Sequence, residues 1–575
     1  MPRFANRTTM SRMQKYQILM FAMLLCHRIY QLRFIPFGSP DDTFMASQAY
    51  SGKSLLSSAL DQGTSQGRFY QPIFMLLTMI PYTLVRLEFL WLLIAFQVIF
   101  FSLSLIYFTW ELWKDLRLSL VIVTTFLLFY DFRGGYNSLT SFPFWFSASF
   151  SLYLISLGLL IRSYLVSEEK KRIYRIASWT ICFFASLAYE SYLIFPFLSL
   201  ILDLQLNSKV TLSSNSSRRI AFNDLLKRKI SSILAVGIFY VAYVSSYATF
   251  RFQFPTDYSG TQVTFNEPAK VLETALRLSA AGYGAFARTF SNFDLHEFFS
   301  ILYMPAASTI LFFILNLTNV FFALTCRTKV DRIGVWCIAI FLPNLLYSLT
   351  ERYQDISQVA PLYLGALLST VAISILFVKV LQSFVRVKKS GYLAYLLVIS
   401  LVLTVVSVRN DTEIIDYVDN RRAQNVAWKF VDAYLSDNSV KNEKLIWLSP
   451  DLDDLIQTHE SYLFWKNYLS MRSNSRVDFF SSDENLKFQG YLRIEIFKEE
   501  KGVAFIGREV GVDGSERVKF VYVYRGENLG VEPIKLIDGF SISNSSSEEF
   551  VVFSPKRGVD QGVLNDALLQ SLNQS

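Results

Sequence analysis

The sequence predicts an α-helical polytopic membrane protein with a small soluble α+β domain at its C-terminal end. Three observations predict this fold class. Of the 575 residues, 52% are hydrophobic, 16% are aromatic and only 18% are charged, which is typical of membrane proteins. Apolar runs recur along residues 1–409, and runs of about 20 residues are long enough to cross a bilayer as helices. From residue 410 the composition becomes that of a soluble domain.

The basic loops fix the orientation, because Lys and Arg gather in cytoplasmic loops. With the N-terminus inside, every later basic loop lies inside if Gln71 to Val85 is a re-entrant or interfacial helix. This stretch is short and is interrupted by Pro72 and Pro81. The threading then has about eleven spans and leaves the C-terminal end outside. The spans lie near 16–37, 88–109, 118–131, 141–162, 175–189, 190–205, 230–250, 298–325, 333–350, 359–379 and 391–408.

The predicted domains are a transmembrane domain over 1–409 and an extracytoplasmic soluble domain over 410–575. In the second, Lys444 to Leu448, Leu492 to Phe497 and Val518 to Tyr524 alternate apolar and polar residues, which predicts strands. Asp451 to Ser470 predicts a helix. Both elements together indicate a small α+β domain of ordinary size.

The net charge of +8 is explained by the loop topology rather than by a nucleic-acid partner. The four cysteines are scattered in or beside apolar runs, and the three histidines lie far apart. The sequence therefore predicts neither a metal site nor a cofactor.

An acidic pair, Asp41-Asp42, directly follows the first span and Ser39-Pro40. Judged locally, it is a helix start: Ser39 is an N-cap, Pro40 takes the first position, and two acids complement the helix dipole. Thr43 to Tyr50 would continue that helix. A carboxylate held rigidly there, just outside the membrane, can also accept a proton from a hydroxyl, so the two interpretations are compatible.

Further motifs give the pair a context. An outer loop ending in Gly67-Arg68 and a short apolar stretch follow Asp41-Asp42, and this layout resembles the GT-C fold glycosyltransferases. It is most similar to their O-antigen glucosyltransferase branch. The segment Tyr189-Glu190-Ser191-Tyr192 is similar to that branch's Tyr-Gln-Ser-Tyr, with Glu190 departing from the pattern. Glu351-Arg352-Tyr353 resembles the Arg-Tyr element of related lipid-phosphate-sugar transferases.

The resemblance implies an inverting membrane hexosyltransferase. Its donor would be a polyprenyl-phosphate-linked sugar, and its acceptor a surface glycan or a lipid-linked glycan of the cell envelope, such as O-antigen or lipopolysaccharide. Asp41 or Asp42 would be the catalytic base, with a slight preference for Asp41. The chain would be a multi-pass protein of the bacterial inner membrane.

Substrate-binding residues are expected among the outer motifs. Arg68 and Arg352 are the preferred ligands of the donor phosphate, because guanidinium groups pair well with phosphate, and Tyr353 accompanies Arg352. Glu190 is either exposed at the tip of a hairpin or buried with a role at the acceptor site. Two other outer arginines, Arg251 and Arg288, are expected to anchor span ends among lipid headgroups.

Two other functions remain open. One is a glycan polymerase or ligase, which the acidic pair disfavours, and the other is a polytopic lipid or solute transporter. Transporters tend to have paired halves with broken helices in matching positions, and the sequence shows no such symmetry.

Overall fold

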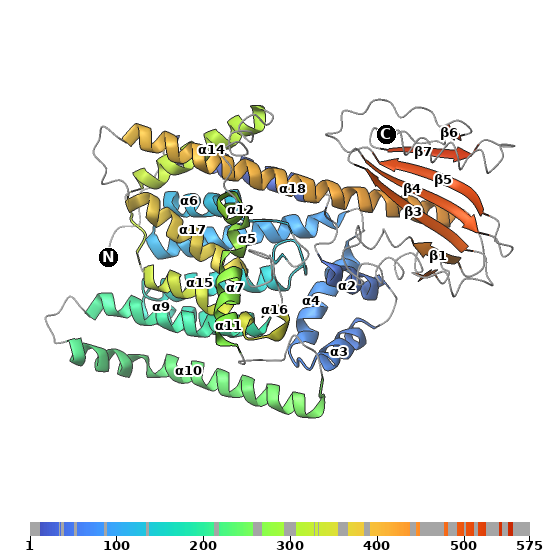
Figure 1. Cartoon of the computed structure of the whole chain (residues 1–575). Helices are drawn as coiled ribbons and strands as arrows, with labels where there is room; N and C mark the ends of the chain where they lie inside the picture. The colour runs from blue at the N-terminus through green and yellow to red at the C-terminus, as the bar shows by residue number, and fades with distance from the viewer. Residues whose placement is uncertain are drawn as a thin grey trace. The chain divides into compact units, whose positions relative to one another are not determined.

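The structure is a computed structural model of the chain (Figure 1). It describes residues 12–33, 35, 39–50, 54–85, 89–133, 137–211, 218–256, 267–291, 306–326, 328–331, 333–354, 366–383, 392–437, 444–448, 477–480, 491–499, 502–510, 516–524, 540–542 and 550–555. Some helix residues, including Glu351 and Arg352, are described by their backbone alone. The chain divides into two compact units. One comprises Met1–Ser39 and Ser54–Ile415, and the other Pro40–Lys53 and Asp416–Ser575.

Helices build the first unit, which we call the membrane unit. In Figure 1 the helices α9 and α10 lie side by side, whereas α11 and α12 run across them. The helices are α1 (Arg12–Leu32), α3 (Leu55–Ser65), α4 (Gln71–Leu84), α5 (Trp91–Trp113), α6 (Leu116–Phe129), α7 (Phe146–Ser163), α8 (Glu168–Ser186), η2 (Glu190–Leu193), α9 (Ile194–Thr211), α10 (Arg218–Gln253), α11 (Pro268–Ala280), η4 (Ala281–Tyr283), α12 (Gly284–Ser291), α14 (Ala306–Thr325), α15 (Ile333–Ser348), α16 (Glu351–Gln354), α17 (Ala366–Ser383) and α18 (Tyr392–Asp437).

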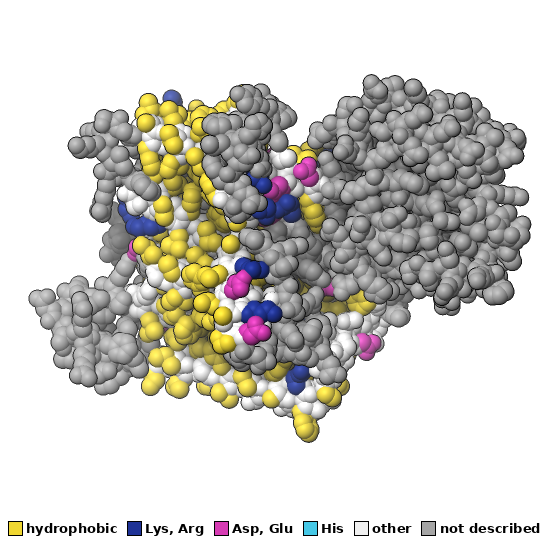
Figure 2. Space-filling view, in the orientation of Figure 1, with side chains coloured by type: hydrophobic (Ala, Val, Ile, Leu, Met, Phe, Trp, Pro, Cys, Tyr) yellow, Lys and Arg dark blue, Asp and Glu magenta, His cyan; other side chains and the backbone are white. Residues whose placement is uncertain are grey.

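Within the described residues, six helical stretches are long and apolar enough to cross a membrane. They are Trp91–Trp113, Phe146–Ser163, Ile230–Gln253, Ser308–Thr325, Ala366–Ser383 and Leu393–Val418. Figure 2 shows hydrophobic side chains over the middle of this unit and charged side chains gathered towards its two ends. The prediction of an α-helical polytopic membrane protein is confirmed.

Local sequence chemistry explains the tight joint between α5 and α6. Lys114 ends α5 in the left-handed conformation, with φ of 54°, which is a common way to terminate a helix. Asp115 then caps α6, because its carboxylate accepts from the backbone N–H of Arg117 at 3.0 Å and of Leu118 at 3.4 Å. An aspartate at the N-cap satisfies donors that the first turn leaves open.

Polar side chains join the helices at a few interior points. The Asn316 amide donates to Ser407 Oγ at 3.0 Å, and the Asn319 amide donates to Thr125 Oγ1 at 2.9 Å. Such bonds hold helices together where lipid provides no hydrophobic driving force.

The second unit contains α2 (Pro40–Tyr50) and a mixed sheet. The sheet's described strands run in the order β2-β1-β3-β4-β5-β7-β6, with β1 parallel to β2 and β3 and the other pairs antiparallel. The strands are β1 (Lys444–Leu448), β2 (Val477–Phe480), β3 (Tyr491–Glu499), β4 (Gly502–Val510), β5 (Glu516–Tyr524), β6 (Phe540–Ile542) and β7 (Phe550–Pro555). The three predicted strands are confirmed, and the predicted helix Asp451 to Ser470 lies outside the described residues.

One predicted boundary differs. The last span was expected to end at residue 408, but α18 continues to Asp437. The charged residues that follow residue 408 ended the apolar run in the sequence. In the structure Asp411 and Glu413 form ion pairs with arginines of other helices, so the helix continues through them. The division between the two units falls after Ile415, within this helix.

Candidate functional site

The Gly67-Arg68 motif lies in the sharp turn between α3 and α4. Gly67 has a φ of +65°, which favours glycine because it has no Cβ. Its N–H donates to Thr64 O at 3.1 Å, and that of Arg68 donates to Gly63 O at 2.9 Å. These bonds fix the backbone on both sides of the turn and therefore the direction in which Arg68 leaves it.

Arg68 is buried and paired with Glu190. Its Nε donates to Glu190 Oε1 at 2.7 Å, and its Nη1 donates to Gln66 Oε1 at 3.1 Å. The guanidinium carbon lies 5.1 Å from the centre of the Tyr189 ring. The Arg68 side chain is 5% exposed and that of Glu190 is 32% exposed. Glu190 lies at the start of η2 and contacts Arg68. It is half-buried, which is intermediate between the exposed and the buried alternatives that the sequence left open.

Arg251 lies against this turn. From the sequence it was expected to anchor a span end among lipid headgroups. A Cβ on Gly67 would lie 2.5 Å from Arg251 Nη1 and 2.8 Å from Arg251 Cδ, so the arginine occupies the space that glycine leaves. Arg251 Nη1 is buried and hydrogen-bonds to no described residue. Just beyond, Thr256 Oγ1 donates to Ser65 O at 2.7 Å, which ties the end of α10 to the end of α3. The sequence predicted only that Arg251 lies on the outer side of the membrane.

Gly67, Arg68, Glu190 and Arg251 together form what we call the Arg68 site. Arg68 pairs with Glu190 there, and the Arg251 guanidinium lies against Gly67. Glu190 Oε2 is also buried without a hydrogen-bond partner among the described residues. A buried charged atom that lacks a partner is costly. Donor and acceptor capacity is therefore left over for a ligand.

Aromatic side chains surround the site. Burial raises the pKa of Tyr70 well above its usual value and the charge of Glu190 raises it further, so the phenol is neutral. The rings of Phe69 and Tyr70 lie 5.5 Å and 6.2 Å from that of Tyr243. Beside Phe69 a groove of about 380 Å³ is lined by uncharged residues, namely Phe69, Ser245, Ser246, Thr249, Phe250 and Gln253.

The Arg352-Tyr353 motif lies in α16. The Tyr353 ring lies 5.0 Å from that of Tyr347, which lies 5.7 Å from that of Tyr189. Tyr353 is therefore connected to Arg68 through a chain of aromatic contacts. The Arg352 side chain is not among those described, so the backbone of α16 alone places it.

Asp41 and Asp42 lie in the first turn of α2, as the helix-start prediction requires. Asp42 is buried and Asp41 is half-buried. This helix belongs to the second unit, whereas the residues of the Arg68 site belong to the membrane unit.

A second charged cluster holds the outer arginine Arg288. Its Nη2 donates to Asp131 Oδ2 at 2.9 Å and to Glu413 Oε2 at 2.6 Å. Arg133 also binds both acids, with its Nε 2.9 Å from Asp131 Oδ1 and its Nη2 3.0 Å from Glu413 Oε2. Arg288 thus connects α12 to α18 and to the segment after α6, in place of the expected headgroup anchoring.

Two ionisable residues of the first helix pair with α18. Arg28 Nη1 and His27 Nε2 lie 2.6 Å and 2.9 Å from Asp411 Oδ1. Arg28 is fully buried and its Nε also donates to Leu127 O at 3.1 Å. Because these partners are far apart in the sequence, no local pattern could have shown them.

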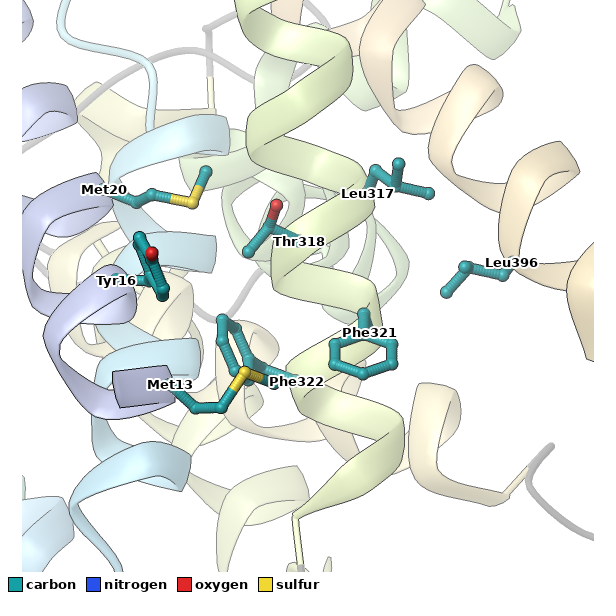
Figure 3. A pocket seen from close by; sticks show the side chains of 8 residues that line it. All are labelled: Met13, Tyr16, Met20, Leu317, Thr318, Phe321, Phe322 and Leu396. Atoms are coloured by element: carbon teal, nitrogen blue, oxygen red, sulfur yellow. The ribbon is translucent and has the colours of Figure 1, made fainter. Parts of the chain in front are cut away.

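An apolar pocket of about 410 Å³ lies between α1, α14 and α18 (Figure 3). Its lining carries no charged side chain and comprises Met13, Tyr16, Met20, Leu317, Thr318, Phe321, Phe322 and Leu396. In the part of the chain that the structure describes, no group of three or more His, Cys, Asp or Glu residues is arranged to hold a metal ion.

Comparison with known proteins adds little. No family model and no curated protein matches the chain. One similar solved structure is the crystal structure of ArnT from Cupriavidus metallidurans bound to undecaprenyl phosphate. The likeness covers 95% of this chain and 98% of that chain, at 12% identity and a TM-score of 0.42.

Proposed function

We propose that this membrane protein is an inverting glycosyltransferase that moves a sugar from a polyprenyl-phosphate donor to a glycan on the outer face of the membrane. The observation that carries the proposal is the Arg68 site. A buried arginine on a glycine turn, with a second arginine against the same glycine, suits the phosphate group of a lipid substrate. The motif resemblance through Asp41-Asp42 and Gly67-Arg68 supports the same assignment.

The reaction needs a base and an anion-binding group. Asp41 or Asp42 accepts the proton of an acceptor hydroxyl, and that oxygen forms a bond to the anomeric carbon of the donor sugar. The bond from this carbon to the phosphate oxygen breaks, and its electron pair leaves with the phosphate. A general base contributes roughly 10² to 10⁴-fold to such a step. Arg68 stabilises the negative charge that develops on the leaving group.

The remaining residues are assigned to substrate binding. Glu190 and Tyr353 lie in contact with Arg68 or connected to it through aromatic rings, and each presents a group that sugars bind: a carboxylate and an aromatic face. Arg352, next to Tyr353 in α16, is a further candidate for the phosphate. We expect no resident cofactor, because cleavage of the donor's sugar–phosphate bond supplies the free energy for the transfer.

The orientation follows from the basic loops. We place the N-terminus in the cytoplasm and the domain over 410–575 outside the cytoplasm. The resemblance implies that the membrane is the inner membrane of a bacterium. A reporter that is active only outside the cytoplasm, fused at the C-terminus, should be active, and a reporter that is active only inside should be silent.

A transfer assay tests the proposal. The purified full-length protein is incubated in nanodiscs with labelled polyprenyl-phosphate sugars and membrane glycans, and label is followed into the glycan. Wild type should transfer label, and Asp41→Asn or Asp42→Asn should lose transfer by about 100-fold or more. The exposed Asp61→Asn, in α3, is the matched control. Undiminished transfer by both variants of the pair would rule out the mechanism, and movement of intact lipid-linked sugar would favour a transporter.

A further inference from the structure

The Arg68 site has an unusual charge balance. Two guanidinium groups, those of Arg68 and Arg251, would give it two positive charges, and Glu190 removes one. Arg68 and Glu190 are in direct contact at 2.7 Å, and Tyr247 of α10 lies in electrostatic range of Arg68, Glu190 and Arg251 alike. These three side chains together carry one net positive charge.

The lipid substrate and the lipid product differ in charge. A polyprenyl-phosphate sugar is a phosphodiester with one negative charge. The polyprenyl phosphate left after transfer is a monoester, whose second ionisation has a pKa of about 6, so that it carries nearly two negative charges at pH 7. Glu190 repels each negative charge of the ligand, so it weakens binding of the doubly charged product more than binding of the singly charged donor.

We propose that Glu190 is a specificity-determining residue, which lowers the affinity of the Arg68 site for the doubly charged product more than for the singly charged donor and so promotes product release. This inference rests on the proposed function. A glutamine at this position would hold Arg68 through one hydrogen bond without removing a charge.

The surroundings make Glu190 the acidic group that controls this balance. Among the described residues, the titratable and charged groups that interact with Glu190 include Arg68, Tyr70, Tyr243 and Tyr247. Tyr189 lies against Arg68, and Arg251 lies against Gly67. The phenols remain neutral near pH 7, because tyrosine ordinarily ionises at about pH 10. In the described membrane unit, the ligand thus meets two fixed cations and one carboxylate.

Equilibrium binding tests the inference. The full-length protein in nanodiscs is titrated with undecaprenyl phosphate glucose and with undecaprenyl phosphate, at pH 7.5 and at pH 5.5. The effect of Glu190→Gln on monoester affinity should be larger at pH 7.5 than at pH 5.5, where the monoester is mostly singly charged, and its effect on diester affinity should be similar at both. In Glu190→Gln, monoester affinity at pH 7.5 should rise at least about tenfold, because one like charge has been removed. Diester affinity should rise less.

Two further variants control the result. Arg251→Gln removes a positive charge from the site, so it should weaken the monoester more than the diester, opposite to Glu190→Gln. Glu273→Gln, in α11, changes the same charge at an exposed ion pair with Arg277 and should leave both affinities unchanged. Thermal unfolding of each variant establishes that it is folded.

Different results would contradict the inference about Glu190 and the proposed function. If Glu190→Gln tightens both lipids equally, or neither, Glu190 does not discriminate by charge, and the inference is wrong even if wild type transfers sugar. If wild type binds neither lipid more tightly than Arg68→Gln does, the Arg68 site does not bind phosphate, and the proposed function loses its main support.

Discussion

The Nε of Arg68 donates to Oε1 of Glu190 at 2.7 Å, although the two residues are 122 positions apart. The bond connects the turn before α4 to the first residue of η2. The same guanidinium faces the Tyr189 ring and donates to Gln66. Arg68 is thus held in one orientation by three neighbours, which is the preorganisation that an anion-binding group requires.

Arg68→Lys should therefore impair the protein although it preserves the charge. An ammonium group lacks the planar fork that bridges Gln66 and Glu190 and faces Tyr189. We expect donor affinity to fall about tenfold or more, and Arg68→Gln should lower it further. Binding of undecaprenyl phosphate glucose provides the measurement, with Arg277→Lys, at an exposed pair, as control. Wild-type affinity in Arg68→Lys would show that charge alone matters.

Gly67→Ala should be destabilising for two separable reasons. A non-glycine residue in the left-handed region costs about 1 kcal/mol, and the new Cβ would collide with Arg251. In the Arg251→Ala background the collision with Arg251 is removed, whereas the backbone cost and the close approach to Thr256 Cγ2, at 2.6 Å, remain. The loss caused by Gly67→Ala should therefore be smaller there. Thermal unfolding in detergent of both singles and the double variant measures this coupling. Additive losses would mean that Arg251 does not press on Gly67.

Sequence reasoning found the features that depend on neighbouring residues. The alternation of Leu492 to Phe497 predicted β3, because each strand face has its own polarity. Pro72 and the short apolar run predicted α4, and Ser39-Pro40 with two acids predicted the start of α2. The Gly67-Arg68 dipeptide was recognised as a motif, although its reason, the left-handed turn, appeared only in the structure.

The sequence could not show which distant residues meet. The Arg68–Glu190 pair and the place of Arg251 against Gly67 depend on how α10 and η2 pack beside the α3–α4 turn, and no local pattern encodes that. The last span was predicted to end early for the same reason, because contacts between residues that are distant in the sequence were not visible. Charged residues normally end an apolar span, but Asp411 and Glu413 find their partners on α1 and α12.

Asp131 should make stability depend on pH in acid. Burial alone would raise the pKa of Asp131, but hydrogen bonds and charges from Arg133 and Arg288 outweigh burial and hold the pKa below its usual value. A carboxylate whose pKa is lowered by folding contributes stability above its unfolded value of about 3.9, and this stability is lost as the pH falls through the folded value.

Thermal unfolding from pH 7 down to pH 3 measures this contribution. Wild type should keep the Asp131 contribution down to about pH 4 and lose it below. Asp131→Asn should be less stable at neutral pH and should lose less stability in acid. The exposed Asp61→Asn controls for the loss of one carboxylate. Parallel acid profiles of wild type and Asp131→Asn would contradict the assignment.

Arg28 and Asp411 should be energetically coupled, with Asp411 the more important partner. Asp411→Leu leaves the fully buried Arg28 guanidinium without a counterion, which costs about 3–5 kcal/mol for a buried pair. Arg28→Met should cost less, because Asp411 Oδ1 still accepts from His27 at 2.9 Å and from Gln31 at 2.8 Å. The double variant Arg28→Met/Asp411→Leu removes both charges, so it should be more stable than Asp411→Leu alone. Thermal unfolding of the four proteins completes the cycle, and the exposed Arg33→Met at the end of α1 is the control. A double variant as unstable as the sum of the two single losses would show that the two charges do not stabilise each other.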